Sequence, residues 1–212
     1  MRISKKLIII IISFITALAL FWLILRFSPY PELRKYQARP HSVRYYDRYG
    51  TLLQITPVGN GLRREVPLDI PQSVKDVFVF AEDRRFYSHW GVDLFSIARA
   101  VSQNLSRQRR VSGASTITMQ LARIVTNETK DIPYSPRQQT FWQKISEAFN
   151  AMRLETRFSK DEILEMYLLS LPFGFSTEGV ASASRIFFAT EISALSPAAL
   201  FCLAVIPRRP SF

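Results

Sequence analysis

The sequence predicts a mainly α-helical domain that carries a small β hairpin at its start and follows a single transmembrane helix. Three observations support this prediction. Residues 7–25 are an almost unbroken apolar run. Residues 42–55 contain Val, Tyr, Leu and Ile on both sides of a turn at residues 48–50, which is typical of two paired strands. After Pro71, apolar residues recur at spacings of three and four, which is typical of amphipathic helices.

The apolar run fits a membrane anchor, because its only polar residues are Ser13 and Thr16. As a helix it would be about 28 Å long, which is close to the hydrocarbon thickness of a bilayer. A basic segment at residues 1–6 also fits a signal peptide, but no small-residue cleavage site follows Leu25, so we predict an uncleaved anchor. Basic residues also follow the run, and the charges therefore leave the orientation of the anchor open.

Composition excludes several other classes of protein. With 48% hydrophobic and 21% charged residues, the chain of 212 residues can form a core and is not disordered throughout. The single cysteine, Cys202, excludes an intrachain disulfide framework and a cysteine zinc site. The two histidines, His41 and His89, are far apart in the sequence, which argues against a His-based metal site. The net charge of +11 together with an anchor favours an anionic, lipid-linked ligand over nucleic acid.

The expected organisation is an anchor, a linker and one domain. Residues 1–26 form a cytoplasmic tip and the transmembrane anchor, residues 27–41 form a linker with three prolines, and residues 42–212 form the domain. Ser159 and Glu162 have the spacing of a capping box, which marks the start of a helix. The expected helices cover residues 72–87, 93–105, 115–125, 139–157, 159–169, 178–188 and 196–206.

The densest group of unusual residues surrounds Phe86. Glu82, Phe86 and His89 would share one face of a helix. Because Glu82 follows an apolar stretch, we expect its carboxylate to be partly removed from water, which suits a proton acceptor for a sugar hydroxyl. The alternative is a surface ion pair of Glu82 with Arg85 or Arg99, an arrangement that is common on charged helical faces.

A second group, residues 112–120, places small and hydroxyl residues before a predicted helix. Such a segment can bind a phosphate or pyrophosphate through free backbone N–H groups. The alternative is an ordinary helix cap, but a cap needs only one Ser or Thr, and here Gln120 and Arg123 follow as well. A third group, Lys144 and Glu147, offers a cation and a second carboxylate, although this pair is also common on solvated helices.

Together these groups resemble the motifs of the peptidoglycan glycosyltransferase family, family 51 of the glycosyltransferases. The family occurs as monofunctional enzymes and as the N-terminal half of class A penicillin-binding proteins, and the resemblance is greatest to the penicillin-binding protein 1C type. The motif E-D-x-x-F-x-x-H-x-G is complete as Glu82, Asp83, Phe86, His89 and Gly91. The motif G-x-S-T-x-T-x-Q is complete as Gly113, Ser115, Thr116, Thr118 and Gln120.

The resemblance implies a lysozyme-like fold on the outer, periplasmic face of the cytoplasmic membrane, held by a single-pass anchor. It implies polymerisation of lipid II by an inverting transfer that releases polyprenyl pyrophosphate. Glu82 would be the general base, and Glu147 would position the pyrophosphate or a divalent ion bound to it, Mg²⁺ or Mn²⁺; no organic cofactor is implied. The implied partners are lipid II, the growing glycan strand, the membrane and cell-wall synthesis proteins, without nucleic acid. The implied substrate-binding residues are Asp83, Phe86, His89, Gly113, Ser115, Thr116, Gln120, Arg123 and Lys144.

Three positions depart from the family pattern. Gln143 replaces an arginine of the motif R-K-x-x-E, Leu169 replaces an asparagine, and Ala199 replaces a glutamate. Loss of one cation near a pyrophosphate would cost about 1.5–3 kcal/mol of transition-state binding. Two other functions therefore stay open: a catalytically idle, membrane-anchored scaffold that binds lipid II or cell-wall partners, and a glycan-cleaving enzyme of the lysozyme type. No Ser-x-x-Lys occurs in these residues, so they encode no penicillin-reactive transpeptidase.

Overall fold

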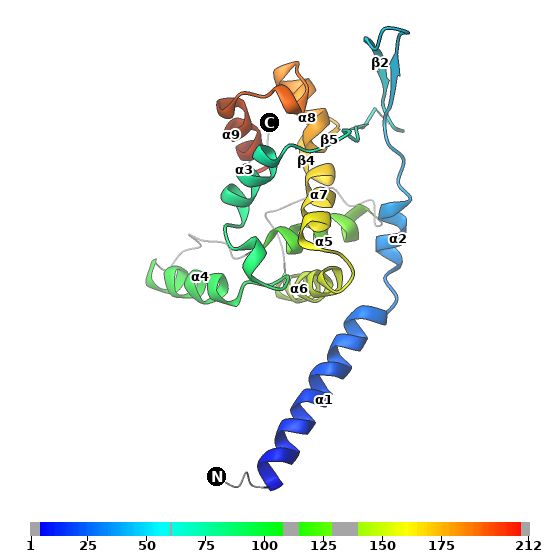
Figure 1. Ribbon diagram of the computed structural model, residues 1–212. Coiled ribbons are helices and arrows are strands. Elements are labelled where there is room, and N and C mark those ends of the chain that lie inside the picture. The colour runs from blue at the N-terminus through cyan, green and yellow to red at the C-terminus, as the bar shows by residue number, and fades with distance from the viewer. Residues whose placement is uncertain (1–4, 60, 108–114, 129–139, 209–212) are drawn as a thin grey trace.

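A computed structural model describes residues 5–59, 61–107, 115–128 and 140–208 of the chain. It confirms a mainly helical domain with a small antiparallel hairpin and an N-terminal apolar helix. Helix α1 (Lys5–Phe27) extends away from the domain, as Figure 1 shows. An 18-residue window of α1 has a mean hydropathy of 3.0 and is 0% buried against the rest of the chain. By length and composition, α1 can cross a membrane.

The linker prediction is wrong for the segment that follows α1. Helix α2 (Pro31–Gln37) forms there, with Pro31 in its first turn, where a missing N–H costs no hydrogen bond. Its Leu33 and Tyr36 are buried in the core of the domain. Just beyond it, Arg39 is buried and pairs with Glu178 at 2.6 Å. The segment is thus a fixed part of the domain and not a free tether.

The domain has two small sheets, and in Figure 1 the hairpin projects at the upper right. The predicted hairpin is confirmed as β1 (Val43–Tyr46) paired antiparallel with β2 (Leu52–Thr56). A second sheet, which the sequence analysis did not predict, has the order β3 (Arg63–Arg64), β5 (Thr177–Glu178), β4 (Pro172–Gly174). In Figure 1, β4 and β5 lie beneath α8 (Val180–Phe188). Glu178 accepts hydrogen bonds from Arg64 and Arg39, so this sheet joins the N-terminal segment to the C-terminal half.

The remaining helices follow the predicted order. Helix α3 ends at Glu82, five residues before its predicted end, because the next residue, Asp83, leaves helical geometry with φ −155°. The capping box predicted at Ser159 and Glu162 is present at the start of α7. The helices are α3 (Gln72–Glu82), α4 (Leu94–Arg107), α5 (Ile117–Glu128), α6 (Phe141–Glu155), α7 (Lys160–Ser170), α8 (Val180–Phe188) and α9 (Pro197–Val205).

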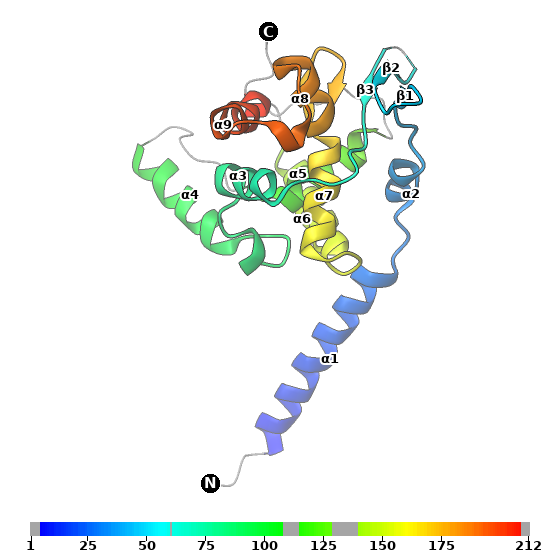
Figure 2. The ribbon, with the colours of Figure 1, turned by 45° about the horizontal axis from the view of Figure 1, so that its top comes forward.

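Helix α5 forms the centre of the core. It packs against α6, α7 and α2, and Figure 2 shows α5, α6 and α7 together in the middle of the domain. Ile117, Leu121 and Val125 of α5 are fully buried, as are Leu164 and Leu168 of α7. Because burial of a Leu or Ile side chain contributes about 1.5–3 kcal/mol, this packing fixes where the N-terminus of α5 lies. The candidate site forms around that N-terminus.

Candidate functional site

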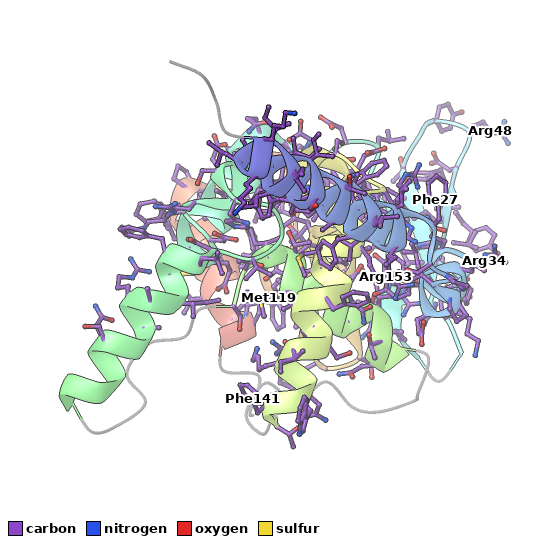
Figure 3. All side chains as sticks on the ribbon, turned by 90° about the horizontal axis from the view of Figure 1, so that it is seen from below. Phe27, Arg34, Arg48, Met119, Phe141 and Arg153 are labelled. Carbon is purple, nitrogen blue, oxygen red and sulfur yellow. The ribbon has the colours of Figure 1, made fainter. Side chains whose placement is uncertain are left out.

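A cavity of about 260 Å³ lies where the end of α3, the start of α4 and the N-terminus of α5 meet. Figure 3, which views the molecule from the side of α1, shows Met119 of α5 between α4 and α6. The cavity wall combines carboxylates, arginines and hydroxyl groups, which suits a polar and anionic ligand. These wall residues are Glu82, Asp83, Asp93, Arg84, Arg85, Arg99, Ser96, Ser115 and Thr116.

Glu82 is the last residue of α3 and is half-buried at the cavity. Its Oε2 accepts a hydrogen bond from Nε2 of Gln120 at 3.1 Å. The Oε1 of Gln120 in turn accepts a hydrogen bond from the hydroxyl of the buried Tyr167, also at 3.1 Å. This chain of hydrogen bonds orients the carboxylate with side chains from α5 and α7. The alternative of a surface pair of Glu82 with Arg85 or Arg99 is wrong, because Arg85 pairs with Asp93 at 3.2 Å and Arg99 donates to Oγ of Ser96 at 3.4 Å.

Three predicted substrate-binding residues join the elements behind Glu82. Oδ2 of the buried Asp83 accepts a hydrogen bond from the backbone N–H of Ile117 at 3.1 Å and lies 2.9 Å from Nε2 of His89. Phe86 is fully buried. Its ring packs edge-on against the His89 ring, with the two ring centroids 6.3 Å apart. We therefore assign Asp83, Phe86 and His89 to holding α3 against α5, and direct contact with substrate stays a prediction for them.

The N-terminus of α5 is capped by protein groups. The hydroxyl of Thr116 donates to the carbonyl oxygen of Gly91 at 2.6 Å and accepts from the N–H of Met119 at 3.1 Å. Since Asp83 and Thr116 take the N–H groups of Ile117 and Met119, the prediction of an anion site on free N–H groups is wrong for these two. Thr116 acts as a helix cap at the cavity wall. Another predicted residue of this loop, Gly113, lies outside the described residues.

Gly91 is expected to be essential for this arrangement. Its φ is +79°, and a Cβ there would lie 3.0 Å from the carbonyl carbon of Ala151. We expect Gly91→Ala to lower the free energy of unfolding by about 1–3 kcal/mol, from backbone strain and crowding. Gly50→Ala is the matched control, because Gly50 also has a positive φ but open space around it. Denaturant unfolding of the detergent-solubilised chain measures the free energy of unfolding of both variants. Equal losses in the two variants would contradict a clash between the new Cβ and Ala151.

A cluster of opposite charges adjoins the cavity. Glu147 on α6 accepts hydrogen bonds from Nε of Arg123 at 2.8 Å and from Nζ of Lys144 at 2.9 Å. Lys144 also donates to Oγ of Ser115 at 2.8 Å, and Ser115 belongs to the cavity wall. Arg123 and Glu147 are both 7% exposed. Among the described side chains, the cluster thus sets two cations against one carboxylate, and positive side chains attract an anion.

The described residues do not form a metal site. No group of three or more His, Cys, Asp or Glu side chains among them could hold a metal ion. The oxygens of Glu147, the predicted contact to a pyrophosphate-bound ion, already accept from Arg123 and Lys144. Mg²⁺ or Mn²⁺ carried by a pyrophosphate stays a prediction.

The structure explains one departure from the family pattern. Gln143 is exposed at the start of α6, where its Oε1 accepts from the N–H of Thr140 at 2.8 Å and completes a capping box. Its side chain therefore stabilises the helix end in place of supplying a charge. Leu169 is half-buried on α7, and Ala199 lies in the first turn of α9 with its N–H bonded to Oγ of Ser196. Nothing in the structure explains these last two replacements.

Sequence reasoning missed two contributors to the site. Tyr167 orients Gln120, and the signal for it was a tyrosine within an apolar helix, since a buried Tyr hydroxyl usually has a partner. Asp93 was predicted only as a helix cap, but it also fixes Arg85 at the cavity. Burial alone would raise the pKa of Asp93, but hydrogen bonds from Ser96 and the charge of Arg85 outweigh it and lower the pKa below its ordinary value. Asp93 therefore stays ionised and keeps Arg85 paired.

The sequence is similar to those of known proteins. The transglycosylase family model matches residues 52–212. Penicillin-binding protein 1A of Rickettsia bellii (strain RML369-C) is 37% identical over 188 residues, which are 86% of this chain and 22% of that protein. Penicillin-binding protein 1A of Neisseria cinerea is 39% identical over 143 residues, 68% of this chain and 17% of that protein. Penicillin-binding protein 1F of Bacillus subtilis (strain 168) is 38% identical over 143 residues, 68% of this chain and 19% of that protein.

The chain thus spans about a fifth of the length of these curated relatives. They carry the names 1A and 1F, so the resemblance to the 1C type stays a prediction. The family match begins within β2 and includes every residue assigned above to the cavity and to the charge cluster. Because this match covers well over half of the residues, the chain belongs to the transglycosylase family.

Proposed function

We propose that this chain is a peptidoglycan glycosyltransferase that polymerises lipid II. One observation carries the proposal: the oriented carboxylate of Glu82 lines a cavity whose wall also contains Ser115, and Ser115 is hydrogen-bonded to Lys144 of the Arg123–Glu147–Lys144 cluster. The reaction needs a base at an acceptor hydroxyl and positive charge at a departing pyrophosphate. The transglycosylase family match supports this activity.

The proposed reaction is a single displacement. Glu82 accepts the proton of the 4-hydroxyl of the incoming disaccharide as that oxygen bonds to the anomeric carbon of the growing strand. The bond from the anomeric carbon to the polyprenyl pyrophosphate breaks, and the pyrophosphate leaves with the electron pair. Attack opposite the leaving group inverts the anomeric carbon. Lys144 and Arg123 lower the barrier because negative charge grows on the pyrophosphate during the step.

Two carboxylates near a cavity also raise the alternative of glycan cleavage. A glycosidase needs a second carboxyl group that donates a proton to the leaving oxygen. Both carboxylate oxygens of Glu147 accept hydrogen bonds, from Arg123 and Lys144, and Glu147 does not line the cavity, so it is not placed to donate a proton there. The arrangement therefore supports transfer from a pyrophosphate, whose leaving group needs no acid. The second candidate is the idle scaffold, which the capping role of Gln143 favours because that side chain supplies no charge.

We further propose that α1 crosses the cytoplasmic membrane and that residues 42–212 form the glycosyltransferase domain on its outer face, with α2 attached. Helices α4 and α6 lie on the side of the domain from which α1 leaves (Figure 1). Phe141 and Trp142 at the start of α6 are 73% and 75% exposed, and Phe95 on α4 is 67% exposed. Aromatic side chains on this side would meet the bilayer, beside the polyprenyl tail of the substrate.

Loss of the exposed aromatic pair should weaken the use of a lipid-linked substrate. For Phe141→Ser with Trp142→Ser we expect the KM for lipid II in vesicles to rise about tenfold, from lost burial of two aromatic rings. Because both rings are exposed, the thermal unfolding temperature should not change. Tyr49→Ser is the control, since Tyr49 is 84% exposed in the hairpin turn, far from α1. An unchanged KM would contradict contact with the bilayer.

One assay separates the candidate functions. The purified full chain is incubated with labelled lipid II in a buffer containing Mg²⁺, and in parallel with a preformed glycan strand. Glycan polymer supports the transferase. Binding of lipid II without polymer would show the scaffold, and shortening of the preformed strand would show the cleaving enzyme.

A further inference from the structure

Arginines gather where α1 meets the domain, at a site that we call the anchor corner: Arg26, Ser28, Arg153 and Arg157. Arg153 in α6 and Arg157 just after it donate to the same carbonyl oxygen, that of Ser28, at 3.2 and 2.8 Å. Arg153 also donates to the carbonyl oxygen of Pro29. Two guanidinium groups that share one carbonyl oxygen lie close together in spite of their like charge.

Arg26, near the end of α1, adds a third positive charge. Burial, and then the charges of Arg153 and Arg26, lower the pKa of Arg157 from its ordinary value, so Arg26 is near enough to repel it. In the part of the chain that the structure describes, none of these three arginines forms an ion pair with a carboxylate. Glu32 of α2 lies near Tyr30 beside this group, so the described part of the corner sets three arginines against one carboxylate.

Two polar side-chain atoms at the corner have no hydrogen-bond partner in the part of the chain that the structure describes. Among the described residues, Oγ of Ser28 and Nε of Arg153 are buried without a partner, and both can donate. Both atoms are buried, so a group that binds from outside would meet the partly exposed side chains of Arg26 and Arg157 instead. Exposed Arg34 on α2 extends the positive surface, and Figure 3 shows Phe27, Arg34 and Arg153 on the same corner of the molecule. Phe27 itself is 72% exposed.

We propose that the anchor corner binds the phosphate of an anionic phospholipid headgroup. A phosphate offers negative charge and several acceptor oxygens, which guanidinium groups bind well. The end of an apolar helix long enough to span a bilayer lies at the depth of the headgroups. The exposed Phe27 then contacts the lipid beneath the headgroup. The proposal rests on α1 spanning the membrane and does not depend on the transfer reaction.

Arg26 is the residue that tests this proposal. Arg153 and Arg157 also clamp the carbonyl groups after α1, so their removal would loosen the anchor itself. The side chain of Arg26 makes no hydrogen bond among the described residues. Its guanidinium carbon lies 5.9 Å from the centre of the Phe27 ring. Arg26→Gln therefore leaves the clamp intact. Arg48→Gln is the matched control, because Arg48 is exposed in the hairpin turn, away from α1.

The experiment is native mass spectrometry of the detergent-solubilised full chain with equal amounts of phosphatidylglycerol and phosphatidylcholine of the same acyl chains. We expect preferential retention of phosphatidylglycerol, reduced about fivefold in Arg26→Gln and unchanged in Arg48→Gln. Equal retention of both lipids, or unchanged retention in Arg26→Gln, would overturn the proposal. In a second experiment the thermal unfolding temperature is measured with inorganic phosphate alone and with phosphatidylglycerol alone. If inorganic phosphate raises this temperature as much as phosphatidylglycerol does, the site binds free phosphate and not a lipid. A chain that binds phosphatidylglycerol but does not polymerise lipid II would still support the lipid site. The lipid site and the transferase activity can therefore fail separately.

Discussion

Replacing Glu82 with glutamine is expected to lower the rate of glycan polymerisation by about 100-fold to 10,000-fold, the usual contribution of a general base. Glutamine keeps the shape of the side chain but cannot take the proton of the acceptor hydroxyl. Because Glu82 is half-buried at the cavity and contacts Gln120, the variant should fold normally. Continuous measurement of lipid II consumption, with thermal unfolding in the same buffer, tests both statements.

Glu165→Gln is the control for this substitution. Glu165 is a glutamate on α7 that pairs with Lys75 at the surface, with its side chain 46% exposed. Its removal should leave the polymerisation rate within about twofold of the wild-type rate, because exposed ion pairs contribute little. If Glu82→Gln retained the wild-type rate, the base would be another group.

Replacing Glu147 with glutamine should damage both stability and activity. The substitution leaves Arg123 and Lys144 without the carboxylate that separates them, and Arg123 is almost fully buried. Removing one partner of a buried ion pair costs about 3–5 kcal/mol, and the partial exposure of Lys144 places the expected loss near the lower end. Denaturant unfolding of the detergent-solubilised chain measures this loss.

The same variant should bind lipid II more weakly, since the two cations lose their fixed positions. Glu165→Gln is again the control, because Glu165 is partly exposed whereas Glu147 is buried. Its loss of unfolding free energy should stay below about 1 kcal/mol. Equal losses for the two variants would show that the buried cluster contributes no more than a surface pair. Normal stability with lost polymerisation would instead assign Glu147 a direct chemical role.

Much of the fold could be predicted because local sequence determines it. Periodicity and caps were enough to place α5, α6, α7 and α9 within a few residues, including the capping box at Ser159. Helix α2 was missed because prolines and charges there resemble a linker, and its stability comes from burial of Leu33 and Tyr36 in the core. The sheet formed by β3, β4 and β5 was missed because strands of two or three residues carry no periodic signal.

The sequence named candidate site residues but not how they are arranged. In the structure Glu82 and Ser115 line one cavity, Gln120 donates to Glu82, and Lys144 donates to Ser115. That Asp83 would accept from Ile117, 34 positions away, depends on tertiary packing that no local pattern reveals. The same holds for the engagement of Gln143 in a cap, which only the geometry of the helix start shows.

The central claim is that one carboxylate removes the acceptor proton while separate cations bind the diphosphate. Its most direct test is single-turnover transfer from saturating labelled lipid II, with binding affinity measured on the same samples of wild-type chain and Glu82→Gln. The account predicts that the variant binds lipid II as tightly as the wild type and transfers almost none of it. Transfer at the wild-type rate, or affinity that falls in parallel with transfer, would contradict it.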